Sequence, residues 1–401
     1  MRQAGEIVGD ATIPLYRRGA GVVAWRWSER IVGLFTNRDP DADAHCALCG
    51  KPRRQVRQLV AGTETYICNE CVVTSYELLG RARAAAVPEL PATAELLRAA
   101  LDAGAVGQQP AKRALAAALW QHLYRVKNPA PQVRVPRVLL VGPSGSGKTA
   151  LGRALCEATT LPAHLADVGR LTESGYVGED VENLLRVLLR EADEDAPLAR
   201  QGVLFLDALE KIVAREPPRG AARDISGEGV QRELLRLLDG LEAEVHAGGA
   251  RHPQMPMVPF RCDTLLVGAA ATFRGEAFEA PASERALRDA LVAAGLLPEL
   301  VARFDVIVRV PALRAPDLVE LLARPERGLL HATRRIVESF GGTLEMTSEA
   351  MVLLAEAAAG DPDGSWALSR PLARLAQEVL ESPAPGRDWK VDADKARALL
   401  G

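Results

Sequence analysis

The stretch Gly142-Pro143-Ser144-Gly145-Ser146-Gly147-Lys148-Thr149 decides the fold of this chain. The spacing of its glycines and the Lys-Thr pair at its end form the pattern of a phosphate-binding loop. A short apolar run over 137–141 precedes the loop and predicts a buried parallel strand, and residues 150–158 predict a helix. A strand, a glycine-rich loop and a helix N-terminus in this order form an anion site. The sequence therefore predicts an α/β fold with a parallel sheet and a nucleotide site.

The residue types in this loop suit ATP. Backbone N–H groups and the helix dipole face the β-phosphate, while Lys148 reaches the β- and γ-phosphates and Thr149 places its hydroxyl on Mg²⁺. A glycine-rich turn that binds nothing is the competing interpretation, and the agreement of loop, strand and helix disfavours it. The predicted nucleotide contacts of the loop are Gly142, Pro143, Ser144, Gly145, Ser146, Gly147, Lys148, Thr149 and Ala150.

A second buried strand is predicted at 203–207, and it ends in Asp207, an acid that suits the magnesium shell of a nucleotide site. Hydrolysis needs a group that activates or positions the attacking water, and an acid directly after Asp207 would serve. The next residue is Ala208, so that acid is missing. Glu210 is the nearest substitute in sequence, although it is also placed to pair with Lys211 or with a neighbouring subunit.

The composition excludes several classes of function. The chain has 401 residues, of which 48% are hydrophobic and 25% charged, as in globular proteins of two or three domains. A net charge of −3 and an aromatic content of 4% give no electrostatic or stacking surface for nucleic acid. No apolar run is long enough to span a bilayer, and no secretory signal pattern opens the chain. We therefore expect a cytoplasmic protein without nucleic-acid or membrane partners.

Four of the six cysteines form two C-x-x-C pairs, Cys46 with Cys49 and Cys68 with Cys71. This spacing suits a tetrahedral Zn²⁺ site with four thiolates, and a closed shell of four ligands makes such a site structural. Four unrelated thiols are the alternative. Metal binding in a reducing compartment is favoured over a disulfide framework.

Two further positions have open interpretations. Tyr176 lies between Gly175 and Gly178 on a polar loop, where it is either presented outward or packed in a surface turn. Arg303 is either an arginine that acts on a neighbouring subunit's nucleotide or an ordinary surface salt-bridge residue.

Together these residues resemble the ClpX family, the hexameric AAA+ unfoldases that form the ATP-binding subunit of the Clp protease. The resemblance covers about residues 44–400 and includes the zinc-module cysteines with the residues beside them. It also includes Val106-Gly107-Gln108, Gly175-Tyr176-Val177-Gly178, the glycine-bearing loop 223–231 and the short basic segment 250–252.

The resemblance implies a role for each segment. Val106, Gly107 and Gln108 lie against adenine, and Tyr176 with Val177 forms a first pore loop that grips polypeptide. Segments 223–231 and 250–252 correspond to the second pore loop and the pore-entrance loop. Arg303 stands at the arginine finger, so Lys148, Asp207 and Arg303 are the implied catalytic residues. The implied cofactors are ATP, Mg²⁺ and Zn²⁺. The implied partners are unfolded or tagged protein substrates and the other subunits of a homo-hexamer or of a mixed ring with a homologue.

The resemblance also sets the expected domains. Residues 1–41 are an extension of unknown role. The other expected divisions are a zinc module at 42–80, a linker at 81–100, a large α/β AAA+ domain at 101–315 and a small domain, helical throughout, at 316–401. The helices expected in the small domain are 316–323, 326–340, 348–359 and 368–381.

Three departures separate the chain from the family pattern. Ala208 replaces the acid after the magnesium-site Asp, and Trp366 replaces an arginine that senses the γ-phosphate. The span 275–295 lacks the Ile-Gly-Phe tripeptide that docks on the peptidase. These departures leave two hypotheses. The first is an ATP-binding unfoldase with weakened hydrolysis, and the second is a degenerate nucleotide-binding regulator or scaffold that no longer drives unfolding or docks on a peptidase.

Overall fold

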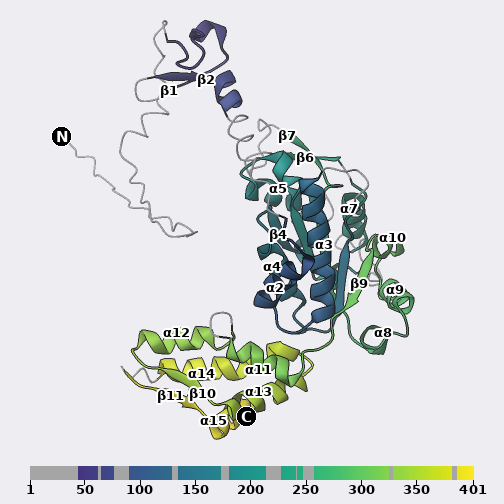
Figure 1. Cartoon of the computed structure of the whole chain (residues 1–401), viewed down its shortest axis with the longest axis vertical. Helices are drawn as coiled ribbons and strands as arrows, with labels where there is room; N and C mark the ends of the chain where they lie inside the picture. Colours follow the sequence, from purple (N-terminus) through teal and green to yellow (C-terminus); the bar gives the residue numbers. More distant parts are fainter. Residues whose placement is uncertain are drawn as a thin grey trace, which may run out of the picture. The chain divides into compact units, whose positions relative to one another are not determined.

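The computed structural model describes residues 44–61, 65–75, 90–128, 134–172, 180–213, 227–240, 242–246, 257–324, 328–381 and 386–401. Figure 1 shows their helices and strands. The chain divides into two compact units, residues 1–83 and 84–401, and each is described by itself. Several predictions fall outside the described residues: the extension 1–41, the pore-loop residues Tyr176 and Val177, the start of the second pore loop at 223–226, and the basic loop 250–252.

The first unit contains a small β-hairpin whose second strand ends at Cys68. Strand β1 (Leu59–Ala61) pairs antiparallel with β2 (Tyr66–Cys68), after a short 3₁₀ helix η2 (Arg53–Gln55). A helical segment over 69–75 follows β2 directly. Among the described residues of this unit, the buried cluster consists of Ala44, Cys46, Leu59 and Cys68, with a few half-buried side chains packed against it. This is too little apolar surface to fold so small a unit unaided.

The second unit is built on a parallel sheet of five described strands in the order β4-β5-β8-β3-β9. These strands are β3 (Val138–Gly142), β4 (Ala163–Asp167), β5 (Val203–Asp207), β8 (Leu266–Thr272) and β9 (Val306–Arg309). Parallel strands end at the same edge, so the residues that follow β3, β5 and β8 meet there. Ligands of open parallel sheets bind at this edge.

Both faces of the sheet are covered, which explains the continuous apolar runs in its sequence. Leu139 and Val141 of β3 belong to one buried core, whereas Val138 and Leu140 belong to the other. Helices α2 (Ala94–Gly104), α3 (Gln109–Lys127) and α4 (Lys148–Glu157) line the second core. The first core is lined by α5 (Val181–Glu191), α7 (Glu228–Leu238), α9 (Glu284–Ala293) and α10 (Pro298–Ala302).

Shorter elements complete the large α/β part. They are η3 (Val168–Arg170), α6 (Ala196–Ala199), η4 (Leu209–Ile212), α8 (Glu276–Glu279) and an antiparallel hairpin of β6 (Glu242–His246) with β7 (Met257–Arg261). Strands β3 and β5 lie where the apolar runs over 137–141 and 203–207 predicted them. Strand β4 was not predicted, because it is an edge strand whose side chains are mostly half-buried.

The C-terminal part is mainly helical and has a core of its own. It contains α11 (Ala315–Ala323), α12 (His331–Ser339), α13 (Ser348–Ala359), η5 (Gly364–Leu368), α14 (Ser369–Glu381) and α15 (Ala393–Leu400). The expectation that it is helical throughout was wrong in one respect, because β10 (Leu344–Met346) and β11 (Trp389–Val391) form a parallel pair. Strands of three residues are too short to produce a readable alternation in the sequence.

Candidate nucleotide site and metal centre

The phosphate-binding loop connects β3 to α4 and depends on Gly145. Gly145 has a φ of 69°, in the left-handed region that favours glycine. A Cβ at this position would lie 2.3 Å from the carbonyl oxygen of Asp363, so the small helical part comes too close for any other residue. The local conformation and the contact with residue 363 therefore both require glycine at this position.

Lys148 is the buried cation of the loop, with an exposed fraction of 6%. Its ammonium donates to the carbonyl oxygens of Gly142 at 2.9 Å and Pro143 at 2.6 Å. Burial lowers the pKa of Lys148 to about 8, although the carboxylates of Glu210 and Asp207 oppose that change. The loop thus fixes a titratable positive charge at the edge of the sheet where phosphates would bind.

Thr149 and Asp207 meet at this edge from two different elements. The Thr149 hydroxyl, at the start of α4, donates to Oδ2 of Asp207, at the end of β5, over 2.6 Å. Hydroxyl and carboxylate oxygens are ligands that Mg²⁺ accepts. The two residues predicted for the magnesium shell are therefore brought together, and their donor atoms fit the ion.

Ala208 and Glu210 show how the chain leaves β5. Ala208 adopts a φ of 64° and turns the backbone into η4. Glu210 then accepts the backbone N–H of Thr272, at the end of the neighbouring strand β8, over 2.8 Å. Lys211 pairs with Asp167 at 2.8 Å instead of forming the expected pair with Glu210. Glu210 lies at the nucleotide edge, as its electrostatic effect on Lys148 also indicates.

The sequence analysis missed two residues at this edge, Thr272 and Arg274. Both follow the apolar run of β8, which lies between β5 and β3 in the sheet. The sequence contained a usable signal, namely polar residues at the end of a buried apolar run, because Asp207 and the phosphate loop follow buried strands in the same way. The order of the strands was the missing information.

Gln108 connects the phosphate loop to the segment that was predicted to lie against adenine. Its side-chain amide donates to the carbonyl oxygen of Ser146 at 2.9 Å and to that of Pro311 at 2.7 Å. Gly107 and Gln108 have φ values of 63° and 57°, so the backbone turns sharply here. A cavity of about 1200 Å³ is lined by both residues and by Pro311. Gln108 therefore contacts the phosphate loop directly, and the adenine role of Val106, Gly107 and Gln108 stays a prediction.

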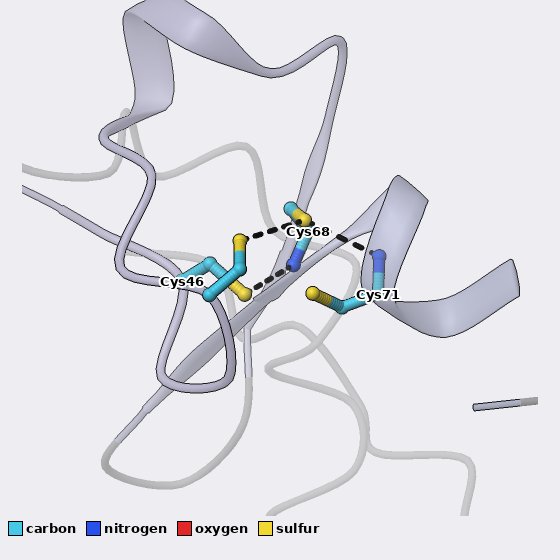
Figure 2. A group of neighbouring side chains, drawn as sticks. Cys46, Cys68 and Cys71 are labelled. Carbon is cyan, nitrogen blue, oxygen red and sulfur yellow. Dashed lines mark hydrogen bonds between the residues drawn. The ribbon is translucent and has the colours of Figure 1, made fainter. Parts of the chain in front are cut away.

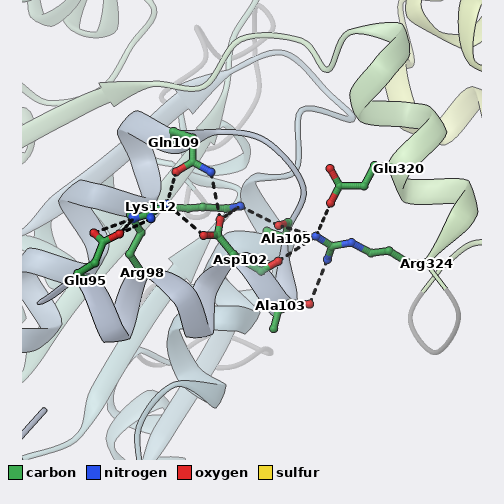
Figure 3. Close-up of polar contacts among 9 residues, drawn as sticks. All are labelled: Glu95, Arg98, Asp102, Ala103, Ala105, Gln109, Lys112, Glu320 and Arg324. Atoms are coloured by element: carbon green, nitrogen blue, oxygen red, sulfur yellow. Dashed lines mark hydrogen bonds and ion pairs between the residues drawn. The ribbon is translucent and has the colours of Figure 1, made fainter.

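Arg324 holds the same region from the small helical part, as Figure 3 shows. Its guanidinium donates to the carbonyl oxygens of Ala103 at 3.0 Å and Asp102 at 2.9 Å, at the end of α2. The carboxylate of Asp102 accepts the ammonium of the buried Lys112 at 2.6 Å. Two cations therefore fix the end of α2, directly before the predicted adenine segment: Lys112 of α3 and Arg324, the residue after α11.

Two arginines, Arg303 and Arg370, are paired with carboxylates. Arg303 contacts Asp239 at 2.5 Å, and the exposed fractions of the two side chains are 37% and 46%. Arg370 contacts Asp363 at 2.6 Å and Asp361 at 3.4 Å. Trp366 is 66% exposed and carries no charge into the loop. Its neighbour Ser365 reaches the loop instead, donating to the carbonyl oxygen of Gly145 at 2.8 Å.

The four predicted metal ligands form one cluster. The sulfur atoms of Cys46, Cys49, Cys68 and Cys71 all lie within 4.8 Å of one another. Figure 2 shows the backbone N–H groups of Cys68 and Cys71 donating to sulfur, at 3.3 Å to Cys46 and 3.4 Å to Cys68. Four convergent thiols with N–H···S support are the donor set of a structural Zn²⁺ site, so the residues fit the metal.

The thiols of this cluster titrate unequally. Burial raises the pKa of Cys46, but N–H donors such as that of Cys68 outweigh it and lower the pKa to about 6. The thiol of Cys49 and burial raise the pKa of Cys71 to about 12. One thiolate in such a cluster opposes the ionisation of the next, and a bound divalent cation would remove that opposition.

Two family models match the chain. Residues 138–285 match the ATPase family associated with various cellular activities (AAA), a span that starts at β3 and includes the phosphate loop, Asp207 and Glu210. Residues 44–81 match the ClpX C4-type zinc finger, a span that contains all four clustered cysteines. In the residues that the structure describes, no helix combines the length and apolar character needed to cross a membrane.

Proposed function

We propose that this chain, whose AAA domain and ClpX-type zinc finger together fit a ClpX-like AAA+ protein, is an ATP-binding chaperone with slow ATP hydrolysis. One observation carries the proposal: Lys148, the Thr149–Asp207 pair and Glu210 converge on one edge of the sheet. The loop and Lys148 bind the phosphates, and Thr149 with Asp207 holds Mg²⁺. Bound Mg²⁺ supplies charge neutralisation on the phosphates.

Glu210 supports hydrolysis in place of the absent acid at position 208. Its carboxylate is held at the nucleotide edge by the Thr272 N–H, so it is available to orient a water molecule from there. A carboxylate placed three residues late and already engaged by a backbone donor is a poorer base than one aimed at the phosphate. We therefore infer turnover that is slow rather than absent.

The experiment is a steady-state ATPase assay on the parent protein, Glu210→Gln and Ala208→Glu. A well-placed general base contributes about 10²–10⁴-fold in rate. Ala208→Glu should therefore raise turnover by at least about tenfold, while Glu210→Gln should lower the slow rate further. Lys211→Gln is the matched control, because Lys211 pairs with Asp167 away from the loop and should leave turnover unchanged.

The outcomes separate the possible readings. Parent turnover already typical of this ATPase family would contradict slow hydrolysis. An unchanged rate in Glu210→Gln would remove the role of Glu210. If Ala208→Glu gains nothing, the second candidate function is favoured.

That second candidate is a nucleotide-gated scaffold that regulates or co-assembles with an active homologue. The observation that favours it is at the small helical part, where Trp366 is exposed and Arg370 is bound to Asp361 and Asp363. No charge from Trp366 then responds to the γ-phosphate. Such a protein would bind ATP tightly and keep a negligible rate in every variant above.

The protein-handling role rests on the family resemblance. We propose that Tyr176 and Val177 contact polypeptide in the pore of a hexameric ring, either of this chain alone or mixed with a homologue. The zinc finger folds the N-terminal unit and takes no part in the chemistry, because four thiolates fill its shell. The clustered free thiols suit a reducing compartment, so we propose the cytoplasm. We propose no docking on a peptidase.

A further inference from the structure

Arg274 lies where the sheet brings the two halves of the phosphate site together. It follows Thr272, the last residue of β8, by two positions, and β8 lies between β5 and β3. Strand β5 ends at Asp207 and β3 leads into the phosphate loop. A side chain that leaves the sheet at this point therefore emerges between the magnesium-site acid and the loop.

The surroundings of Arg274 include the loop itself. Arg274 lines a cavity of about 490 Å³ together with Gly142, Pro143 and Ser144, and Gly364 of the small helical part lines the same cavity. The positive charge of Arg274 acts on Lys148 and helps to lower the pKa of that buried ammonium. A cation close enough to oppose the protonation of Lys148 is also close enough to attract an anion that Lys148 binds.

The guanidinium also touches the small helical part. It donates through Nη2 to the carbonyl oxygen of Pro362, next to the segment whose Ser365 donates to Gly145 of the loop. An arginine has five N–H donors in a planar fork, so a single carbonyl contact leaves capacity for an anion. Arg274 is thus positioned to contact the loop cavity and the small helical part at once.

Two other arginines considered for the nucleotide site are engaged by carboxylates. Arg303 is paired with Asp239, and Arg370 is paired with Asp361 and Asp363. Within the part of the chain that the structure describes, Arg274 has no carboxylate partner in any salt bridge. Arg309 also lines this cavity, and its guanidinium donates to a backbone carbonyl oxygen, that of Glu279.

We propose that Arg274 is a further catalytic residue, which binds the terminal phosphate of ATP from within its own subunit and links that contact to the small helical part. It would supply the charge that Trp366 does not. The proposal rests on the nucleotide site proposed above. The physical basis is that a guanidinium forms strong, charge-assisted hydrogen bonds with phosphate and stabilises the charge that develops during transfer.

The test compares affinities for ADP and for a non-hydrolysable ATP analogue, measured by calorimetry with Mg²⁺ on the full chain. A hydrogen bond to a charged group corresponds to roughly a 10- to 100-fold change in affinity. Arg274→Gln should weaken binding of the ATP analogue by about that factor and leave ADP binding unchanged. Arg274→Lys, which keeps the charge, should retain part of the preference for the analogue. Arg274 is exposed, so we expect both variants to fold, and thermal unfolding checks this.

Two further variants make the result specific. Arg309→Gln removes the other cation of the same cavity and should leave the ratio of the two affinities unchanged, as should Arg370→Gln. An equal loss for both nucleotides in Arg274→Gln, or no loss, would overturn the proposal. A loss of analogue preference in Arg370→Gln but not in Arg274→Gln would assign the role to Arg370 instead. If the parent binds neither nucleotide, the proposed function itself fails, which is a different result from an unchanged ratio.

Discussion

Lys148 shows how the fold changes the chemistry of a single residue. A solvated lysine has a pKa of about 10.4. Burial in the loop lowers the pKa of Lys148 to about 8, despite the nearby carboxylates of Glu210 and Asp207. The side chain therefore titrates just above neutral pH, and a bound polyphosphate would favour its protonated form.

This shift predicts that nucleotide affinity depends on alkaline pH. As pH rises through about 8, Lys148 of the free protein loses its proton, whereas phosphates stabilise the charged form and raise its pKa. ATP affinity should therefore fall above pH 8, by at most about tenfold per pH unit, with uptake of up to one proton on binding. Calorimetry in buffers of different ionisation enthalpy measures that proton.

Lys148→Arg is the control, because arginine does not titrate in this range and should abolish proton uptake. If the parent takes up no proton at pH 8.5, the lowered pKa or the contact with phosphate is wrong.

At the scale of the element, α3 carries polar side chains into the core without leaving them unpaired. Lys112, with an exposed fraction of 1%, contacts Asp102 at 2.6 Å and the carbonyl oxygen of Ala105 at 2.8 Å. His122 is fully buried, with its Nε2 at 2.7 Å from the carbonyl oxygen of Gln201. These contacts hold α3 against α2 and against the segment that leads into β5.

His122 should make folding sensitive to acid. Burial lowers its pKa to about 4, so it is neutral when folded but binds a proton near pH 6.5 when unfolded. The contribution of His122 to the unfolding free energy is therefore fully present above pH 6.5 and is lost as the pH falls toward 4. Between pH 7 and 4.5 the parent should lose roughly 2–3 kcal/mol more unfolding free energy than His122→Gln. Urea unfolding at both pH values measures this, and identical losses in the two proteins would contradict it.

The zinc module makes a separate prediction at this scale. Cys68 is buried in the centre of its cluster, and the module has little other core. Cys68→Ser should lose the metal and unfold residues 44–75, because metal binding supplies the folding free energy of such units. Metal analysis should show one zinc per parent chain and none in the variant, while ATP affinity stays within about twofold, since the phosphate loop belongs to the other compact unit.

Cys156→Ser is the matched control. Burial raises the pKa of the Cys156 thiol to about 12, so it stays protonated, and it lies outside the cluster. Full zinc content in Cys68→Ser would contradict the four-thiolate site.

At the scale of the whole molecule, the small helical part contacts both ends of the nucleotide region. Arg324 binds the end of α2 before the predicted adenine segment, and Ser365 binds the phosphate loop at Gly145. A nucleotide that changes either end would therefore change the contacts of the small helical part. This coupling is the kind of two-site linkage by which ATP could control assembly.

Arg303 provides the prediction for assembly. Its pair with Asp239 is exposed, and such surface pairs contribute little to stability because water and salt screen them. Arg303→Ala should therefore fold and bind ATP normally, yet lose the ring formation that ATP promotes in the parent. Sedimentation with and without ATP measures this. Arg261→Ala, which breaks a similar exposed pair with Asp263, should assemble as the parent does. A parent that stays monomeric with ATP would count against a ring.

Local sequence pattern was enough to predict several parts of this protein. The glycine loop with Lys148, the apolar run that ends at Asp207 and the paired cysteines were all readable, because their chemistry fixes residue types at short spacing. The resemblance to the ClpX family followed from these segments, and the AAA and zinc-finger matches confirm the fold that it implied.

Tertiary structure decided the features that depend on strand order. The edge strand β4 and the pair β10 and β11 lack an apolar run long enough to be read. Glu210 is separated from Thr272 by 62 residues and Arg274 from Pro362 by 88, yet each pair is in contact. A parallel sheet orders its strands through crossovers rather than by sequence, so only the folded chain shows which residues meet at its nucleotide edge.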